Sequence, residues 1–199
     1  RWIAEHAAEL GGKSGPVVVA GWSAGGNVAA VTCQLAQERG GPDIAGQLLI
    51  CPVTDSSFDR PSYADNATGY FLTRSLMYWF WDIYCSPADR ADPRVSPLRG
   101  KLGNLPPALV VTCEFDPLRD EGVAYAEALA AAGVPVEQIK ARGHIHSSLM
   151  MVGVVITGVG ARAQMANALR RFAGLPESKG ESVGPGATAP LRQIDAAAG

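Results

Sequence analysis

The sequence has little net charge, few cysteines and no long apolar run, and each shortage excludes a class of protein. Its 199 residues carry a formal net charge of −2, which offers no basic surface for nucleic acid, so we expect no such partner. No run reaches the roughly 18 apolar residues of a membrane span. The four cysteines are too sparse for a disulfide scaffold and lack C-x-x-C spacing. We expect neither a bound metal nor a cofactor.

The first residues and one short motif bear on where the protein resides. The chain begins at Arg1 and starts directly in a helical pattern, which indicates a piece of a longer polypeptide. Asn66-Ala67-Thr68 matches a glycosylation acceptor, but no secretory signal accompanies it. We expect a cytoplasmic protein, and assembly into a homodimer stays open.

The most informative stretch is an apolar run, Val17–Ala20, that leads into G-x-S-x-G and then into an alanine-rich helical pattern. A serine hydroxyl must be presented to a base before it can act as a nucleophile, and a sharp strand-to-helix turn at Ser23 does this. At Gly21 and Gly25 we expect a Cβ to collide across the turn. The same turn aims the N–H of Ala24 at a position where negative charge can develop.

The rest of the chain alternates between apolar strands and helical patterns, which predicts an α/β fold with a parallel sheet. One domain is expected over 1–174, and the glycine- and proline-rich residues 175–199 are expected to form a disordered tail. The expected strands are Val17–Gly21, Gln47–Cys51, Ala108–Cys113 and Val136–Ala141, the last followed by an exit loop at Arg142–His146. The expected helices are 2–10, 24–39, a helix from about 119 through Ala132, and Ala161–Phe172.

Residues 54–97 differ from the rest because most of the aromatic side chains lie there. Thr73 can cap a helix that carries Leu76, Phe80 and Ile83 at core-facing spacing. Ordinary core packing is one explanation for these rings. The other is an apolar pocket for a ligand. We predict that Phe71, Trp79 and, beside the serine, Trp22 line such a pocket.

Polar side chains follow three of the expected strands. Ser23, Asp116 and His146 come just after the first, third and fourth strands, where the carboxyl ends of parallel strands meet at one edge of the sheet. We therefore expect the three residues to lie close together despite their separation in sequence.

Three motifs together resemble those of the bacterial hormone-sensitive-lipase-like esterases, which have an α/β-hydrolase fold. They are Gly21–Gly26, Asp116–Glu121 and Gly143–His146, and they occur in the order Ser, Asp, His. The resemblance implies hydrolysis of short- to medium-chain carboxylic esters through an acyl-enzyme. It also implies that Ser23 is the nucleophile, His146 the base and then acid, and Asp116 the residue that orients the imidazole.

Other acids and another histidine compete for these roles. Glu114, Asp120 and Glu121 are alternative acids, although the last two also suit the first turn of a helix. His144 is the rival base. The family pattern places the histidine three residues after the glycine, which favours His146.

The sequence also departs from the family pattern. Trp22 stands where relatives carry Asp or Thr, and Ser147-Ser148 where they carry Gly-Phe. The His-Gly-Gly-Gly oxyanion motif and the preceding strands are absent from these 199 residues, so Val17–Ala20 is expected at an open sheet edge. A non-catalytic fragment or small-ligand-binding module is therefore the alternative function. Amide or carbamate substrates stay open, while Gly158–Ala163 is a poor match to a dinucleotide-binding motif.

Overall fold

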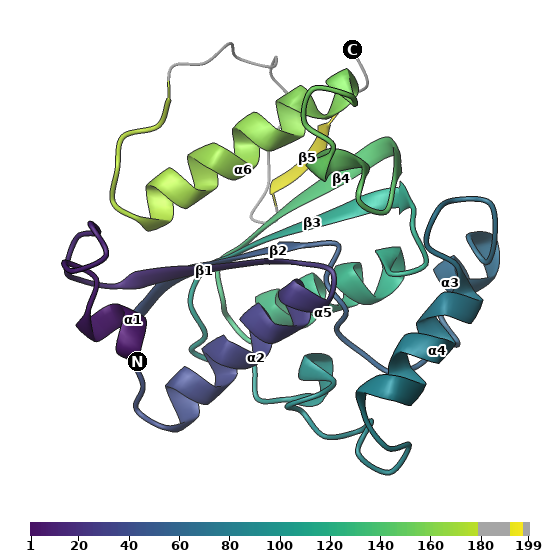
Figure 1. Cartoon of the computed structure of the whole chain (residues 1–199), viewed down its shortest axis with the longest axis horizontal. Coiled ribbons are helices and arrows are strands. Elements are labelled where there is room, and N and C mark those ends of the chain that lie inside the picture. The colour runs from purple at the N-terminus through teal and green to yellow at the C-terminus, as the bar shows by residue number, and fades with distance from the viewer. Residues whose placement is uncertain (179–191, 197–199) are drawn as a thin grey trace.

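The computed structural model describes residues 1–178 and 192–196, and Figure 1 shows a parallel sheet between two layers of helices. The strands are β1 (Val17–Trp22), β2 (Ile44–Ile50), β3 (Ala108–Phe115), β4 (Val136–Ile145) and β5 (Arg192–Ala196). The helices are α1 (Trp2–Glu5), α2 (Ala24–Glu38), α3 (Pro61–Asp65), α4 (Arg74–Tyr84), α5 (Arg119–Ala131) and α6 (Val159–Phe172). Short 3-10 turns lie at Pro97–Arg99, Ser148–Met150 and Ile156–Gly158.

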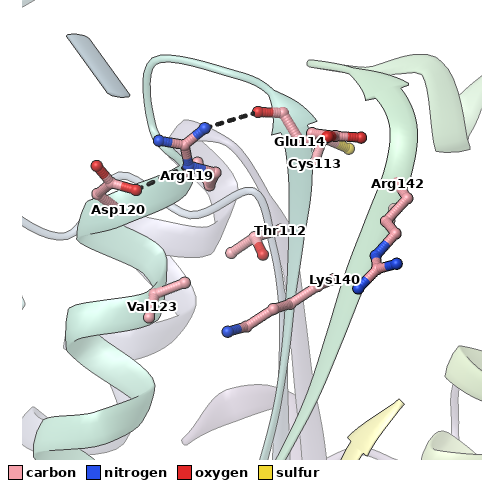
Figure 2. Close-up of a pocket in the computed structure, with 9 residues that line it drawn as sticks. Thr112, Cys113, Glu114, Arg119, Asp120, Val123, Lys140 and Arg142 are labelled. Atoms are coloured by element: carbon pink, nitrogen blue, oxygen red, sulfur yellow. Dashed lines mark hydrogen bonds and ion pairs between the residues drawn. The ribbon is translucent and has the colours of Figure 1, made fainter. Parts of the chain in front are cut away.

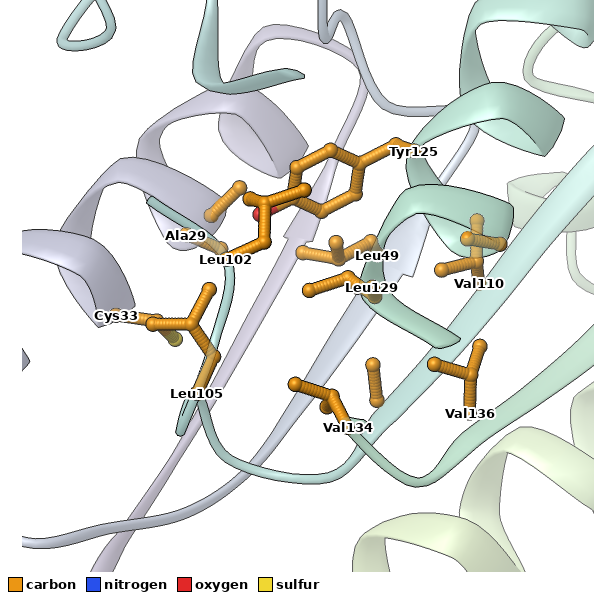
Figure 3. Packing of buried hydrophobic residues seen from close by; sticks show 13 residues of the cluster. Ala29, Cys33, Leu49, Leu102, Leu105, Val110, Tyr125, Leu129, Val134 and Val136 are labelled. Atoms are coloured by element: carbon orange, nitrogen blue, oxygen red, sulfur yellow. The ribbon is translucent and has the colours of Figure 1, made fainter. Parts of the chain in front are cut away.

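The described strands pair in the order β1-β2-β3-β4-β5, and all of these pairs are parallel. Successive residues of a strand face opposite sides of a sheet, and each side here has its own core. Leu49 of β2 faces the cluster formed with α2 and α5, whereas Leu48 faces the cluster formed with α6. Figure 3 shows Leu49, Val110 and Tyr125 in the first of these clusters.

Helix α6 packs so closely on the sheet that a side chain at Gly46 of β2 has no room. A Cβ there would lie 2.2 Å from Cγ of Phe172. A third cluster joins α3 and α4 to the end of β3, and its buried members are Tyr63, Leu72, Met77, Trp81 and Leu118. The third cluster holds the segment 54–97 beside the carboxyl ends of the strands (Figure 1).

The α/β architecture predicted from the sequence is confirmed, and several boundaries differ. Helix α1 ends at Glu5, four residues into the expected 2–10 helix. Strand β4 continues to Ile145, so the prediction of a loop over Arg142–Ile145 is wrong. The physical reason is that Phe115 pairs with Ile145 across a register shift, which extends the ladder. No helix in the described part of the chain is long and apolar enough to cross a membrane.

The expectation of a disordered tail from residue 175 is also wrong for two described segments. Residues 175–178 are tied to α6, because Asn167 Oδ1 accepts a hydrogen bond from the Ser178 N–H at 3.0 Å. Arg192–Ala196 form β5, which pairs with the outer edge of β4 and satisfies backbone groups that would otherwise lack partners. The remainder of the expected tail, 179–191 and 197–199, lies outside the described residues.

Candidate active site

Strand β1 delivers Ser23 on a strained turn into α2. Ser23 has φ 55° and ψ −120°, in a backbone region that costs energy for a residue with a Cβ. The turn is tight because a Cβ at Gly21 would lie 2.0 Å from the Gly25 carbonyl oxygen. At Gly26 a Cβ would lie 2.8 Å from Cβ of Pro52. Gly25 itself has open space around it, so the prediction that a Cβ collides there is wrong; Gly26 is the second glycine that the turn requires.

The structure brings Ser23, His146 and Asp116 into one hydrogen-bonded chain. His146 Nε2 lies 3.1 Å from Ser23 Oγ, and His146 Nδ1 lies 2.7 Å from Asp116 Oδ2. When the imidazole is neutral, an N–H on Nδ1 donates to the carboxylate, which leaves Nε2 free to accept the hydroxyl proton of Ser23. This arrangement can remove a proton from the serine as it attacks an electrophile.

Asp116 is held from several sides. Its side chain is buried, and its Oδ1 accepts a hydrogen bond from the Leu118 N–H at 2.9 Å. One carboxylate oxygen is thereby fixed on the turn into α5 while the other faces the imidazole.

The surroundings of His146 change its affinity for a proton. Burial lowers the pKa of His146, but its hydrogen bonds with the Asp116 carboxylate and with Cys51, together with the charge of that carboxylate, raise it more, to about 9. The carboxylate thus stabilises the imidazolium that forms when the base accepts a proton.

His144, the alternative base, is hydrogen-bonded to Ser148 and not to Ser23. His144 precedes His146 by two residues, but its Nδ1 is 2.9 Å from Ser148 Oγ, and Ser148 Oγ in turn donates to the Ile145 carbonyl at 2.9 Å. Burial lowers the pKa of His144. Its ring is engaged in the turn after β4 and makes no hydrogen bond to Ser23 among the described contacts.

Two of the alternative acids serve the structure and line a separate cavity. Glu114 accepts a hydrogen bond from the Gly143 N–H at 2.7 Å, and Asp120 accepts one from Arg119 Nε at 2.8 Å. Figure 2 shows both acids with Arg119 in a charged cavity of about 440 Å³ between α5 and strands β3 and β4. Ser23 and His146 are not among the residues that line it.

The third alternative acid, Glu121, is completely buried. Burial raises its pKa to about 8, although hydrogen bonds partly offset this. Its Oε1 accepts from the Thr54 N–H at 2.7 Å, and its Oε2 accepts from the Tyr63 hydroxyl at 3.0 Å. Glu121 therefore connects α5 to residues 54–63 and makes no described contact with His146.

Ala24, the expected oxyanion donor, lies at the N-terminus of α2. Ala24 is the first residue of the helix and is exposed, and the N–H of a first helical residue has no acceptor within its own helix. The helix dipole favours negative charge at this end.

An apolar pocket of about 450 Å³ opens beside Ser23 and Ala24, between α2 and α4. Its lining also includes Asn27, whose Nδ2 donates to the carbonyls of Val53 at 3.0 Å and Val95 at 2.7 Å. The sequence analysis missed Asn27, because a polar residue one turn into a helix has no distinctive pattern. The other lining residues are uncharged, namely Val28, Val53, Leu72, Met77, Phe80, Trp81, Ile83 and Tyr84.

The three predicted pocket residues are not among those that line this pocket. Phe71 and Trp79 are 64% and 54% exposed, and Trp22 lies over the triad histidine with ring centroids 5.8 Å apart. Trp79 points away because of the rotation of α4, whose buried face carries Met77 and Trp81. Leu76, Phe80 and Ile83 were predicted on the buried face but are all at least 40% exposed.

A buried thiol, that of Cys51, lies next to Asp116 and His146. Cys51 has φ 43°, and its Sγ is 3.5 Å from Sγ of Cys113. The hydrogen bond with Cys113 and burial raise the pKa of the Cys51 thiol well above its usual value. Ligand atoms of Cys51, Asp116 and His146 lie within 4.8 Å of one another. A metal there would have to break the 2.7 Å contact between His146 and Asp116.

The chain is similar in sequence to known hydrolases. A model of the alpha/beta hydrolase fold family matches residues 1–150. The chain is 40% identical over 176 residues to carboxylesterase NlhH of Mycobacterium tuberculosis, a match that covers 86% of this chain and 55% of that protein. It is 41% identical over 158 residues to ethyl acetate hydrolase of Pseudomonas putida, covering 78% of this chain and 50% of that protein.

The chain is also similar to a solved esterase structure. The crystal structure of a thermostable esterase from Pseudomonas putida has a TM-score of 0.77 at 46% identity, covering 86% of this chain and 55% of that one. The chain thus spans about half the length of the relatives it matches. With the serine turn and the order of its motifs, these matches show that the chain belongs to the hormone-sensitive-lipase-like branch of the α/β-hydrolase fold family.

Proposed function

We propose that the chain carries the nucleophile, base and acid of a serine carboxylic-ester hydrolase. The observation that supports this most directly is the hydrogen-bonded chain Ser23–His146–Asp116, with contacts of 3.1 and 2.7 Å. Relatives named as carboxylesterases and esterases support the same class of reaction.

The reaction follows from the positions of these atoms. Ser23 Oγ attacks the ester carbonyl carbon while its proton passes to His146 Nε2, and the Ala24 N–H donates to the developing oxyanion. The imidazolium then gives its proton to the leaving alcohol, and an acyl-enzyme results. Water attacks the acyl-enzyme with His146 again as the base, which releases the carboxylic acid and restores Ser23.

The pocket beside α4 suits the acyl part of the substrate. His146 must reach the leaving oxygen, so the alcohol part lies on the side of His146 and Trp22. The apolar pocket contacts Ser23 and Ala24 but not His146. A pocket of about 450 Å³ without charged lining residues fits short to medium acyl chains.

Labelling of the nucleophile tests the proposal. A fluorophosphonate with a short alkyl chain should add to Ser23, as peptide mass spectrometry would show, and p-nitrophenyl butyrate should compete with it. Ser23→Ala should lose all labelling, while Ser57→Ala, a matched change at a serine outside the site, should keep it. Labelling that persists in Ser23→Ala would show that another residue is the nucleophile. Ester binding without any labelling would favour the alternative, a small-ligand-binding module.

A further inference from the structure

Helix α3 touches the turn that carries Asp116, through hydrogen bonds that involve both side chain and backbone. Ser62 Oγ donates to the Pro117 carbonyl at 2.6 Å, and the Ser62 N–H donates to Asp120 Oδ2 at 2.8 Å. The Asp120 N–H donates back to Ser62 Oγ at 3.3 Å. Ser62 therefore bridges the Pro117–Leu118 peptide and the first turn of α5.

Asn66, the residue that follows α3, holds the same turn at the Asp116–Pro117 peptide. Asn66 Nδ2 donates to the backbone carbonyl of Asp116 itself at 3.2 Å. Asn66 is 2% exposed and Ser62 is fully buried. Asn66 also belongs to the Asn-Ala-Thr sequence that matches a glycosylation acceptor, but its buried amide is engaged with Asp116.

A second bond fixes α3 itself against α5. The Tyr63 hydroxyl donates to Glu121 Oε2 at 3.0 Å, and Tyr63 is fully buried. Because Ser62, Tyr63 and Asn66 reach successive parts of one turn, α3 cannot shift without moving the backbone that carries Asp116. Buried polar groups are costly unless they are paired, so this set of bonds resists displacement.

We infer that Ser62 and Asn66 are positioning residues, which hold the backbone of Asp116–Pro117 so that the Asp116 carboxylate stays aimed at His146. They touch neither Ser23 nor His146 in the described contacts and act only through Asp116. The inference rests on the proposed function. It gives α3 a role in the reaction, whereas the sequence suggested only core packing or a pocket wall for residues 54–97.

A purely structural role for α3 makes a different prediction from a positioning role. If the carboxylate drifts from Nδ1, His146 loses the strongest of the interactions that raise its pKa, and the pKa falls. The pH at which Ser23 becomes reactive then moves to lower values. Loss of stability alone leaves that pH unchanged.

The experiment measures the fluorophosphonate labelling rate of Ser23 against pH in Asn66→Leu and Ser62→Ala. Both variants should label up to about 10²-fold more slowly, as expected for a catalytic group displaced by about 1 Å. The midpoint of their pH profiles should shift to lower pH than in the unmodified chain. Ser62→Thr keeps the hydroxyl and should restore much of the rate and the midpoint.

Gln47→Leu is the matched control. Gln47 is also a fully buried amide, and it donates to a backbone carbonyl, that of Pro106, at 3.0 Å on β2. This variant should keep the pH midpoint, whatever its effect on thermal stability, because Gln47 lies away from the Asp116 turn. If Asn66→Leu and Ser62→Ala also keep the midpoint while they melt earlier, the positioning role is wrong. If the unmodified chain does not label at Ser23, the proposed function itself fails, which is a separate result.

Discussion

His146 lies between a carboxylate and a hydroxyl in a buried site, and these neighbours set the pH range in which it can act. A base must be unprotonated to accept the proton of Ser23. The Asp116 carboxylate helps to raise the pKa of His146 to about 9, so protonation of the imidazole should compete with its action as a base below that pH. The reactivity of Ser23 should therefore depend on pH.

The labelling rate of Ser23 should rise as the pH increases from 7 through about 9 and level off above it. Asp116→Asn removes the charge that raises the pKa of His146. Its profile should have a midpoint nearer 6.5 and a maximal rate lower by up to about 10⁴-fold, because the imidazole loses its orienting partner. The measurement is a stopped-time labelling series over this range. A midpoint below 6.5 in the unmodified chain would contradict the account.

At the scale of single residues, the sequence predicted that the three triad residues lie close together, but it did not predict the side chains that surround them. Ser23, Asp116 and His146 each follow a strand, and parallel strands bring such residues to one edge, so their proximity could be foreseen. The sequence gives no sign that His144 bonds to Ser148, or that Cys51 lies within 4.8 Å of the triad. These contacts depend on side-chain directions that only the packed structure fixes.

The turn between β1 and α2 shows how two glycines of one motif differ at the scale of an element. Gly21 faces the Gly25 carbonyl oxygen across the turn, at a separation that leaves no room for a Cβ. Gly25 lies at the exposed start of α2 with open space around it. The pentapeptide pattern alone does not distinguish these two environments.

Gly21→Ala should destabilise the protein by about 1–3 kcal/mol, the usual cost of forcing atoms into a packed site. Gly25→Ala should leave the stability unchanged or raise it by up to about 1 kcal/mol, because alanine favours helices over glycine. Urea unfolding followed by circular dichroism measures both. Equal destabilisation in the two variants would show that the turn is looser than the structure has it.

Helix α4 was predicted correctly as an element but with the wrong face buried. Thr73 caps the helix as expected, since its Oγ1 accepts the Leu76 N–H at 3.2 Å. The residues Trp79, Phe80 and Trp81 are adjacent and all aromatic, so the spacing of apolar residues does not single out one face. Packing against Leu118 and Tyr63 in the third cluster decides it.

At the scale of the whole molecule, the order of elements could be predicted from the sequence because strand patterns alternate with helical patterns, and the patterns of β1 and β3 are mostly apolar. Strand β5 could not be predicted from the sequence, because apolar and polar residues alternate only weakly over Arg192–Ala196. The strand pairs with the free edge of β4. The site likewise draws on parts of the molecule that are distant in sequence. Residues 62–66, 116–121 and 146 meet there only after the sheet has formed.

The 199-residue chain should hydrolyse p-nitrophenyl butyrate slowly even if Ser23 labels well. Within these residues Ala24 supplies an oxyanion donor, but no His-Gly-Gly-Gly sequence is present to add another. One such donor is worth about 10²–10³ in kcat. A polypeptide with a His-Gly-Gly-Gly segment fused before Arg1 and folded against the sheet is the comparison. Equal kcat values would contradict this account of the oxyanion site.

Among the described strands, β1 has a neighbour on one side only, and Ser23 follows its last residue directly. The outer backbone groups of β1 can accept another strand. A second polypeptide that docks along this edge would therefore end beside the reactive hydroxyl.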